Sequence, residues 1–167
     1  MIKKLLLIAL VALPLSLSAQ TLKFGTVNTV EIFNIMPEKA AAEKQLEELS
    51  KQYEGEFMKM QEEFQTKYKN FVNEADSLPE NIKQRRMQEI QEMQQRIQNF
   101  REVAASDLEE QQNKMIAPLQ EKISAAVKAV GDENGFTFIF DLSIPSVLYS
   151  GGQAIDATPL VKAKMGL

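Results

Sequence analysis

Among its 167 residues the chain has no histidine, no cysteine and no tryptophan. Histidine is the commonest general base and the commonest metal ligand, so its absence argues against acid–base and metal catalysis. Without cysteine, no disulfide can support the fold. A glycine-rich phosphate-binding loop is also missing, which argues against ATP dependence. These gaps favour a protein that is not an enzyme and that needs no cofactor.

Long apolar runs are equally scarce, and the one at the N-terminus is short. Lys3 and Lys4 precede an apolar run from Leu5 to Leu13, which small residues follow. This order is typical of a secretory signal peptide, and the run is too short to span a membrane. We predict that residues 1–19 are the signal peptide, cleaved after Ala19, and that the mature chain is exported.

Positive charge is limited as well. The formal net charge is −4, and loss of the two lysines of the signal peptide takes it to −6. Proteins that bind nucleic acid usually carry an excess of positive charge, because they must neutralise phosphates. The mature chain is therefore not expected to have nucleic acid as its main partner.

What the chain does contain is an apolar pattern that repeats every eleven residues. The repeat consists of Leu46, Leu49 and Tyr53, then Phe57, Met60 and Phe64, then Tyr68, Phe71 and Ala75. Eleven residues over three turns is about 3.67 residues per turn, close to the natural pitch of an α-helix. One nearly straight helix therefore keeps these side chains on one face. We predict such a helix from Pro37 to about Ala75, roughly 57 Å long at 1.5 Å per residue.

A second amphipathic helix follows a break at residues 76–80. Ser77 and Glu80 have the spacing of a capping box, which predicts a helix start. Apolar residues then recur at intervals of three and four: Ile90, Met93, Ile97, Phe100, Ala104, Leu108, Met115 and Leu119. Pro118 lacks a backbone donor and is expected to kink this helix, which should end between Gly131 and Gly135. Two long helices joined by a short break predict an antiparallel hairpin.

The two ends of the mature chain contain the residues that favour strands. We predict short strands at residues 23–27, 136–140 and 147–150. Thr158 before Pro159 is expected to cap a last short helix. Three short strands cannot close a sheet, so their edges would be exposed unless other copies of the chain cover them.

The predicted fold class is therefore α+β and mostly α. A long antiparallel helical hairpin, the arm, occupies residues 37–118. It stands on a small β-rich body, formed by residues 20–36 and 119–167, that is shared between subunits of an oligomer. The residues expected to hold the oligomer together are apolar residues of the strand regions: Phe24, Val27, Phe136, Phe138, Ile139, Phe140 and Leu148.

Two segments resemble a known family: KFGTVNTVEIF at residues 23–33 and the stretch from GFTFIFD to DATPLV at residues 135–161. They are similar to the Skp/OmpH family of periplasmic chaperones. The resemblance implies a periplasmic trimer with a shared β-body, whose three helical arms enclose a cavity. It also implies an ATP-independent holdase that binds unfolded outer-membrane proteins, its clients, and prevents their aggregation. The alternative is a coiled-coil structural spacer or adaptor in the cell envelope, which would have one fixed partner.

Client contacts are expected from apolar residues that lie off the main stripe: Met58, Val72, Met87 and Val103. Met58 and Val72 are fourteen residues apart, so on a regular helix they lie within about 40° of each other. Methionine suits promiscuous contacts because it is flexible and polarisable. Scattered exposed apolar residues are also ordinary, so this second interpretation stays open. The stripe itself is expected to bury against the other helix of the hairpin.

Basic residues gather near the predicted tip of the arm: Lys67, Lys69, Lys83, Arg85 and Arg86. Acidic residues lie among them, namely Glu63, Glu74, Asp76 and Glu80. One interpretation is a solvated surface with ion pairs between residues four apart. The other is that the tip attracts acidic client segments or makes transient contact with an anionic membrane surface.

Overall fold

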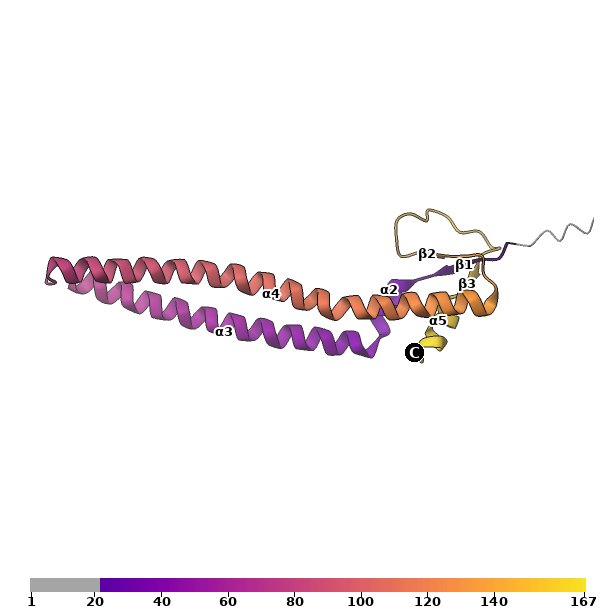
Figure 1. Ribbon diagram of the computed structural model, residues 1–167, viewed down its shortest axis with the longest axis horizontal. Coiled ribbons are helices and arrows are strands. Elements are labelled where there is room, and N and C mark those ends of the chain that lie inside the picture. Colours follow the sequence, from indigo (N-terminus) through magenta and orange to yellow (C-terminus); the bar gives the residue numbers. More distant parts are fainter. Residues whose placement is uncertain (1–21) are drawn as a thin grey trace, which may run out of the picture.

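The computed structural model describes residues 22–167, so the predicted signal peptide lies outside the described residues. The elements are β1 (Phe24–Val27), α2 (Thr29–Ile35), α3 (Pro37–Glu74), α4 (Glu80–Asn134), β2 (Phe138–Asp141), β3 (Ile155–Asp156) and α5 (Thr158–Met165). Figure 1 shows α3 and α4 as a long hairpin that projects from one side of a small body. The body holds the strands, the short helices and the C-terminus. The predicted combination of long helices with a small sheet is confirmed.

The eleven-residue stripe of α3 lies in the seam, the surface between α3 and α4. Its residues are partly buried from Leu46 to Ala75, while most of their neighbours in the sequence are exposed. Tyr68 is the exception; its ring is exposed and stacks on that of Phe64 at 6.1 Å. Along the arm only Met93 and Ala104 are fully buried. The arm therefore has one narrow line of apolar contact.

The capping box predicted at the tip of the hairpin is wrong. The helix α4 begins at Glu80 with Pro79 as its N-cap and with no hydrogen bond from a capping side chain. Ser77 instead lies in the turn that follows α3, where its backbone N–H and its hydroxyl both donate to the carbonyl oxygen of Glu74, at 2.9 and 2.8 Å. The Ser77 hydroxyl therefore bonds to the preceding helix and does not cap α4.

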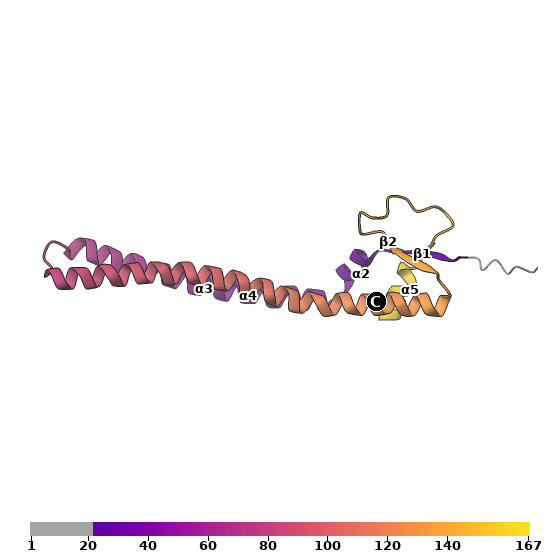
Figure 2. The same cartoon turned by 45° about the horizontal axis from the view of Figure 1, so that its top comes forward.

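The helix α4 runs from the tip of the arm through Pro118 into the body. Figures 1 and 2 show one continuous helix whose axis changes direction near the base of the arm. Gly135 ends it in the left-handed conformation, with φ of 67°, and its N–H donates to the carbonyl oxygen of Gly131. Glycine adopts this conformation without the steric cost of a Cβ. The end of the second helix is therefore where the glycines predicted it.

The sheet has three parallel strands in the order β2-β1-β3. Parallel neighbours need a long crossover, and between β1 and β2 this crossover includes the whole arm. The strand predicted at 147–150 is wrong: these residues form a loop, and β3 pairs with β1 in their place. The N–H of Ala157 donates to Thr26 at 2.7 Å and extends this pairing toward α5. Both sides of β1 are then occupied.

The core of the body lies between the sheet and the helices. Nine buried apolar residues form it: Val27, Ile32, Met36, Leu119, Ile123, Ala126, Val130, Ala157 and Val161. They come from β1, α2, the base of α4 and the segment around α5. Gly25 lets β1 approach closely, because a Cβ there would lie 2.9 Å from the ring of Phe136. This core fixes the position from which the arm projects.

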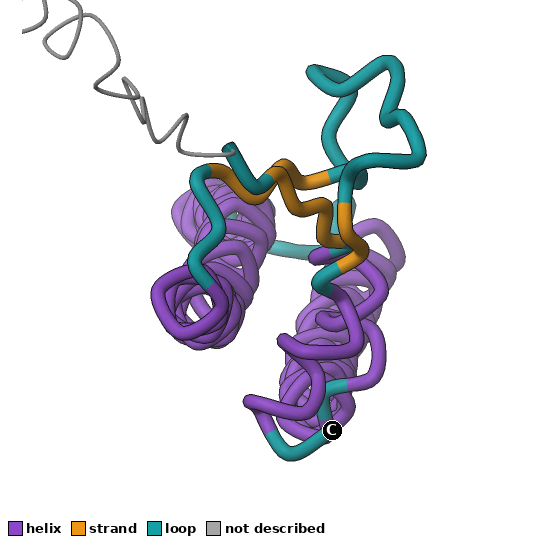
Figure 3. The backbone as a smooth tube through the Cα atoms, turned by 90° about the vertical axis from the view of Figure 1, so that its right-hand side faces the viewer, coloured by secondary structure: helices purple, strands orange, loops and turns teal. Residues whose placement is uncertain are grey.

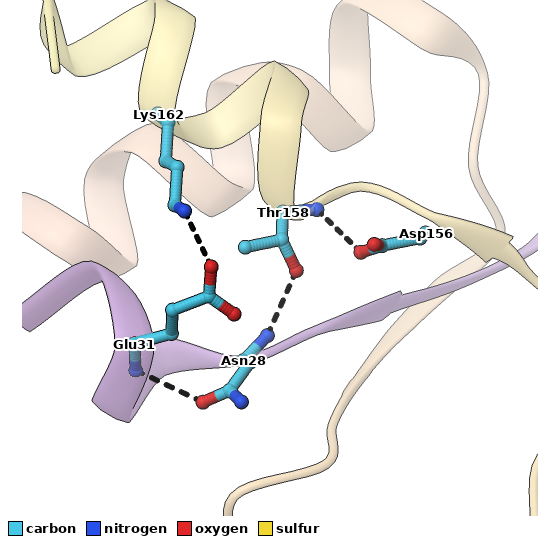
Figure 4. A network of polar contacts seen from close by, with 5 residues as sticks. All are labelled: Asn28, Glu31, Asp156, Thr158 and Lys162. Atoms are coloured by element: carbon cyan, nitrogen blue, oxygen red, sulfur yellow. Dashed lines mark hydrogen bonds and ion pairs between the residues drawn. The ribbon is translucent and has the colours of Figure 1, made fainter.

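Figure 4 shows how polar contacts join the start of α2 to the start of α5. Asn28 caps α2 by accepting from the N–H of Glu31 at 2.9 Å, and its own N–H donates to the hydroxyl of Thr158 at 3.1 Å. The N–H of Thr158 donates to Asp156 at 2.9 Å, and Lys162 pairs with Glu31. Thr158 is therefore the first residue of α5 and not its cap, which corrects the prediction.

Candidate functional site

The sheet presents an aromatic face on the side away from the helices. Phe24, Phe138 and Phe140 form it, with ring centroids between 5.9 and 6.4 Å apart. All three side chains are exposed, Phe138 by 57%. Side chains alternate across a strand, so Ile139 points the other way and packs against the core. The aromatic face is an apolar surface that the rest of residues 22–167 covers only in part.

The loop 142–154 stands on the same side of the sheet as the aromatic face. Figures 1 and 3 show it beyond the strands, with α4 and α5 on the opposite side. It carries two very exposed side chains, Leu148 at 94% and Tyr149 at 86%. A groove of about 350 Å³ separates the loop from the sheet, with Phe24, Phe140 and Tyr149 in its lining.

The residues predicted to hold an oligomer therefore divide into two groups. Phe24, Phe138, Phe140 and Leu148 are exposed. Val27, Phe136 and Ile139 instead belong to the core of this chain or pack against it, so they support the sheet from within. Tyr149 was missed, although it directly follows Leu148 in the sequence.

Asp141 fastens the end of β2 to the start of α2. Its carboxylate accepts hydrogen bonds from the backbone N–H and hydroxyl of Thr29 and from those of Ser143. Burial raises the pKa of Asp141, but these four hydrogen bonds favour the carboxylate more strongly, so its pKa lies below the usual value. This clamp helps to hold the aromatic strand β2 in place.

One flank of the arm has a groove of about 310 Å³ whose walls are amides. Two glutamines from each helix line it, Gln61 and Gln65 of α3 and Gln94 and Gln98 of α4. Three apolar side chains also line it: Phe57, Phe64 and Ile97. Arg101 lies at one end, with its guanidinium 5.5 Å from the ring centroid of Phe57. We call this surface the amide groove; its lining contains no carboxylate.

Three of the four predicted client residues lie on the flank of the amide groove. Residues seven apart on a straight helix differ by only about 20° around its axis. Met58 and Val72 are each seven residues from Gln65, so they lie on nearly the same side of α3 as Gln65. Met87 is seven residues before Gln94 and lies on nearly the same side of α4 as Gln94. Their side chains are exposed by 45 to 59%.

Val103, the fourth predicted client residue, lies elsewhere. It is two residues beyond Arg101, which turns its side chain about 200° away on a regular helix. Its side chain is 65% exposed. The four candidates therefore do not share one surface, because Met87 and Val103 lie on different sides of the same helix α4.

The predicted basic tip is mostly paired with acids. Arg86 pairs with Glu74 across the hairpin, and both line a second groove of about 230 Å³ together with Lys67 and Glu89. Lys67 pairs with Glu63 and Arg85 pairs with Glu89, each at 3.6 Å. Lys69 and Lys83 form no ion pair with any residue from 22 to 167. We call the groove lined by Lys67, Glu74, Arg86 and Glu89 the ionic groove.

A polar contact crosses the seam nearer the body. The hydroxyl of Tyr53 donates to Asp107 at 2.7 Å, and the ring of Tyr53 meets that of Phe100 edge-on at 5.9 Å. This hydrogen bond raises the pKa of Tyr53 and lowers the pKa of Asp107. The contact fixes the register of the two helices, as the pair between Arg86 and Glu74 does at the tip.

Residues 22–167 offer no arrangement of three or more His, Asp or Glu side chains that fits a metal ion. None of the helices they form is both long and apolar enough to cross a membrane. The surfaces described above are thus extended faces and shallow grooves, distributed over a body and an arm.

The sequence from residue 23 to residue 165 matches the OmpH-like outer membrane protein family. The chain belongs to the OmpH-like family. The match covers the arm as well as both ends, which confirms the resemblance predicted from the two end segments. Two relatives of this OmpH-like chain carry the name chaperone protein Skp. The one from Photorhabdus luminescens is 29% identical over 160 residues, covering 92% of this chain and 93% of the relative. That from Photorhabdus laumondii subsp. laumondii is 28% identical with the same coverage.

Proposed function

We propose that this OmpH-like protein is an ATP-independent holdase of the periplasm, which binds unfolded outer-membrane proteins and prevents their aggregation. The observation that carries the proposal is the match to the family, with similarity to Skp chaperones along nearly the whole chain. A leader at residues 1–19 would direct its export. An enzymatic role finds no support in the shallow, dispersed grooves described above.

The proposed mechanism is enclosure. Unfolded barrel proteins carry strands whose unpaired edges join other strands, and this pairing leads to aggregation. The arm at residues 37–118 would surround such a client and keep its strands apart. Many weak contacts would replace one tight site, which fits scattered exposed residues such as Met58 and Val72. The body at residues 20–36 and 119–167 would hold several arms together.

The proposed assembly is a homotrimer joined through the sheet. Support comes from the exposed ring stack of Phe24, Phe138 and Phe140, because monomeric proteins rarely leave a large contiguous apolar patch in water. Phe138→Asp should dissociate the assembly, since a buried unpaired charge is costly. Light scattering would measure the mass. Leu160→Asp, an exposed position on α5, is the control. A stable monomer of the parent protein at micromolar concentration would rule out the assembly.

The decisive experiment for the holdase function is an aggregation assay. A urea-denatured outer-membrane β-barrel protein is diluted into buffer with and without the mature protein, and light scattering is followed. A holdase suppresses scattering without ATP. A coiled-coil spacer or adaptor, the alternative function, has no affinity for denatured chains and leaves the scattering unchanged.

A triple variant locates the apolar client contacts. Met58→Ser, Val72→Ser and Met87→Ser together should weaken the suppression, because about 25 cal/mol is lost per Å² of apolar contact. Val103→Ser tests the fourth predicted client residue separately, since Val103 is 65% exposed and lies on a different face. Unchanged suppression by the triple variant would remove these residues from the contact surface.

The tip of the arm is proposed to make transient contact with an anionic membrane surface. Lys69 and Lys83 are the cations that carry this proposal, because the other basic residues of the tip have acidic partners. Such an attraction is screened by salt, with a Debye length near 10 Å at about 0.1 M. Binding to anionic vesicles that persists in high salt would argue against it.

A further inference from the structure

We propose that the amide groove binds an extended segment of an unfolded chain, with its glutamine side chains hydrogen-bonded to the backbone of that segment. This inference rests on the proposed holdase function and assigns it a surface and a chemistry. The occupant is a strand-like segment about six residues long. The hydrogen-bonding state of the glutamines, the apolar lining, the length and the charge of the groove each support the assignment.

The four amides of the groove have unused hydrogen-bonding capacity. Three glutamines elsewhere on the arm donate to neighbouring carboxylates: Gln84 to Glu80, Gln88 to Glu92 and Gln111 to Asp107. Other arm glutamines, such as Gln52 and Gln95, have no such bond to any described residue, so free amides are not peculiar to the groove; what is peculiar is that four of them line one groove. Within residues 22–167, no side-chain hydrogen bond engages Gln61, Gln65, Gln94 or Gln98. Each amide offers two donors and an acceptor. An extended chain presents N–H and C=O groups along both edges, so amides on two walls match it regardless of its sequence.

The groove also has an apolar lining, and it lies on a flank long enough for a short strand. Phe57, Phe64 and Ile97 supply apolar surface between the glutamine walls. Successive side chains of a strand point to opposite faces, so every second side chain of the segment would meet this surface. From Met58 to Val72 the flank extends about 21 Å at 1.5 Å per residue. A strand advances about 3.3 Å per residue, so roughly six residues fill it.

The exposed apolar residues lie at the two ends of the flank that carries the groove. The pair of Glu74 with Arg86 sets the register at the tip. Val72 is two residues before Glu74 and Met87 one residue after Arg86, so these two side chains lie at one level, at the outer end. Met58 lies next to Phe57, whose ring faces Arg101, at the inner end.

Charge separates the amide groove from the ionic groove on the other flank. The amide groove has Arg101 and no carboxylate in its lining. In the ionic groove, two carboxylates and two cations line the surface, and Glu74 and Arg86 already pair with each other. A neutral backbone gains little by displacing an existing ion pair. The amide groove is therefore the surface that suits an uncharged strand.

Photo-crosslinking tests the location directly. A benzoylphenylalanine is placed at Gln65 or Gln94 in the groove, or at the equally exposed Gln52 or Gln95 outside it, in the full mature protein. The probe is a urea-denatured outer-membrane β-barrel protein. We expect crosslinks mainly at Gln65 and Gln94. Equal or stronger crosslinking at Gln52 and Gln95 overturns the groove assignment, while the holdase function stands.

A matched pair of double variants tests the amide chemistry. Gln65→Glu with Gln94→Glu keeps the side-chain shape but removes donors, whereas Gln52→Glu with Gln95→Glu adds the same charge outside the groove. We expect the first pair to weaken client binding about fivefold or more, the equivalent of one lost hydrogen bond, and the second to change it little. Equal effects of both pairs contradict the proposal. If the parent protein itself does not suppress aggregation, the holdase function fails, and the groove assignment fails with it.

Discussion

The body and the arm share the helix α4, yet they differ in how much side chain they bury. In the body, nine apolar residues from several elements form one core, with Ile32 and Val161 completely buried. Along the arm, α3 has no fully buried residue at all, and α4 buries only Met93 and Ala104 there. A single helix, α4, passes from one environment to the other.

This difference in burial implies that the body is rigid while the arm can adapt its conformation. Regions with few buried apolar contacts open locally at low free-energy cost, whereas a packed core opens only with the whole domain. The body is thus suited to hold a geometry and to join copies. The arm is suited to adjust to clients of different shape, at the cost of its own stability.

The largest effect is expected from the body. Ile32→Ala leaves a cavity in the core and should lower the free energy of unfolding by about 2 to 5 kcal/mol. Because β1, α4 and α5 share this core, the sheet should be lost together with α2. Urea denaturation followed by circular dichroism would measure the loss. A change below about 0.5 kcal/mol, as at a surface site, would contradict the assignment of the core.

A substitution in the seam is expected to reduce stability less than one in the core, and only within the arm. Phe64→Ser removes a half-buried ring and should destabilise the arm by about 2 kcal/mol, roughly half the cost for a fully buried Phe. Amide exchange should then accelerate in α3 and the outer part of α4, while the body keeps its protection. Tyr68→Ser is the control, because Tyr68 is exposed. Loss of protection in the body would show that arm and body unfold as one unit.

The smallest effect concerns pH and the bond between Tyr53 and Asp107. This bond lowers the pKa of Asp107, so its contribution is present above the ordinary value of about 3.9 and is lost as pH falls through the lowered pKa. It raises the pKa of Tyr53, so the contribution is present below about 10 and is lost as pH rises through the raised pKa.

The arm should therefore show a plateau of helicity in circular dichroism between these two limits. Tyr53→Phe removes the hydroxyl and should lower the plateau slightly while removing the loss at high pH. An identical pH profile for the parent and the variant would show that the bond does not form in solution.

The periodic parts of the fold were predictable from the sequence. The eleven-residue repeat from Leu46 to Ala75 predicted one long helix, because only a helix keeps such a stripe on one face. Pro37, which is favourable in a first turn, predicted where α3 begins. The glycines at 131 and 135 predicted the end of α4. These signals are local, and tertiary packing only reinforces them.

The sequence-based predictions were wrong where contacts between distant parts of the chain determine the local structure. Residues 147–150 are rich in strand-forming side chains, but a strand needs a partner, and β3 takes the place beside β1. Ser77 has the spacing of a cap, but the carbonyl of Glu74 uses its hydroxyl. The amide groove was missed because its walls come from two antiparallel helices. Seven-residue spacing of Gln65 from Met58 was the signal that could have indicated it.

Hydrogen exchange of the mature protein, alone and with a urea-denatured outer-membrane β-barrel protein, tests the central claim most directly. We predict that amides from residue 56 to residue 100 exchange faster in the free protein than those of the strands, and that they gain protection when the client binds. Amides of β1, α2 and the base of α4 should be protected in both states. Equal protection of arm and body in the free protein, or a gain confined to the body, would contradict the division of roles between them.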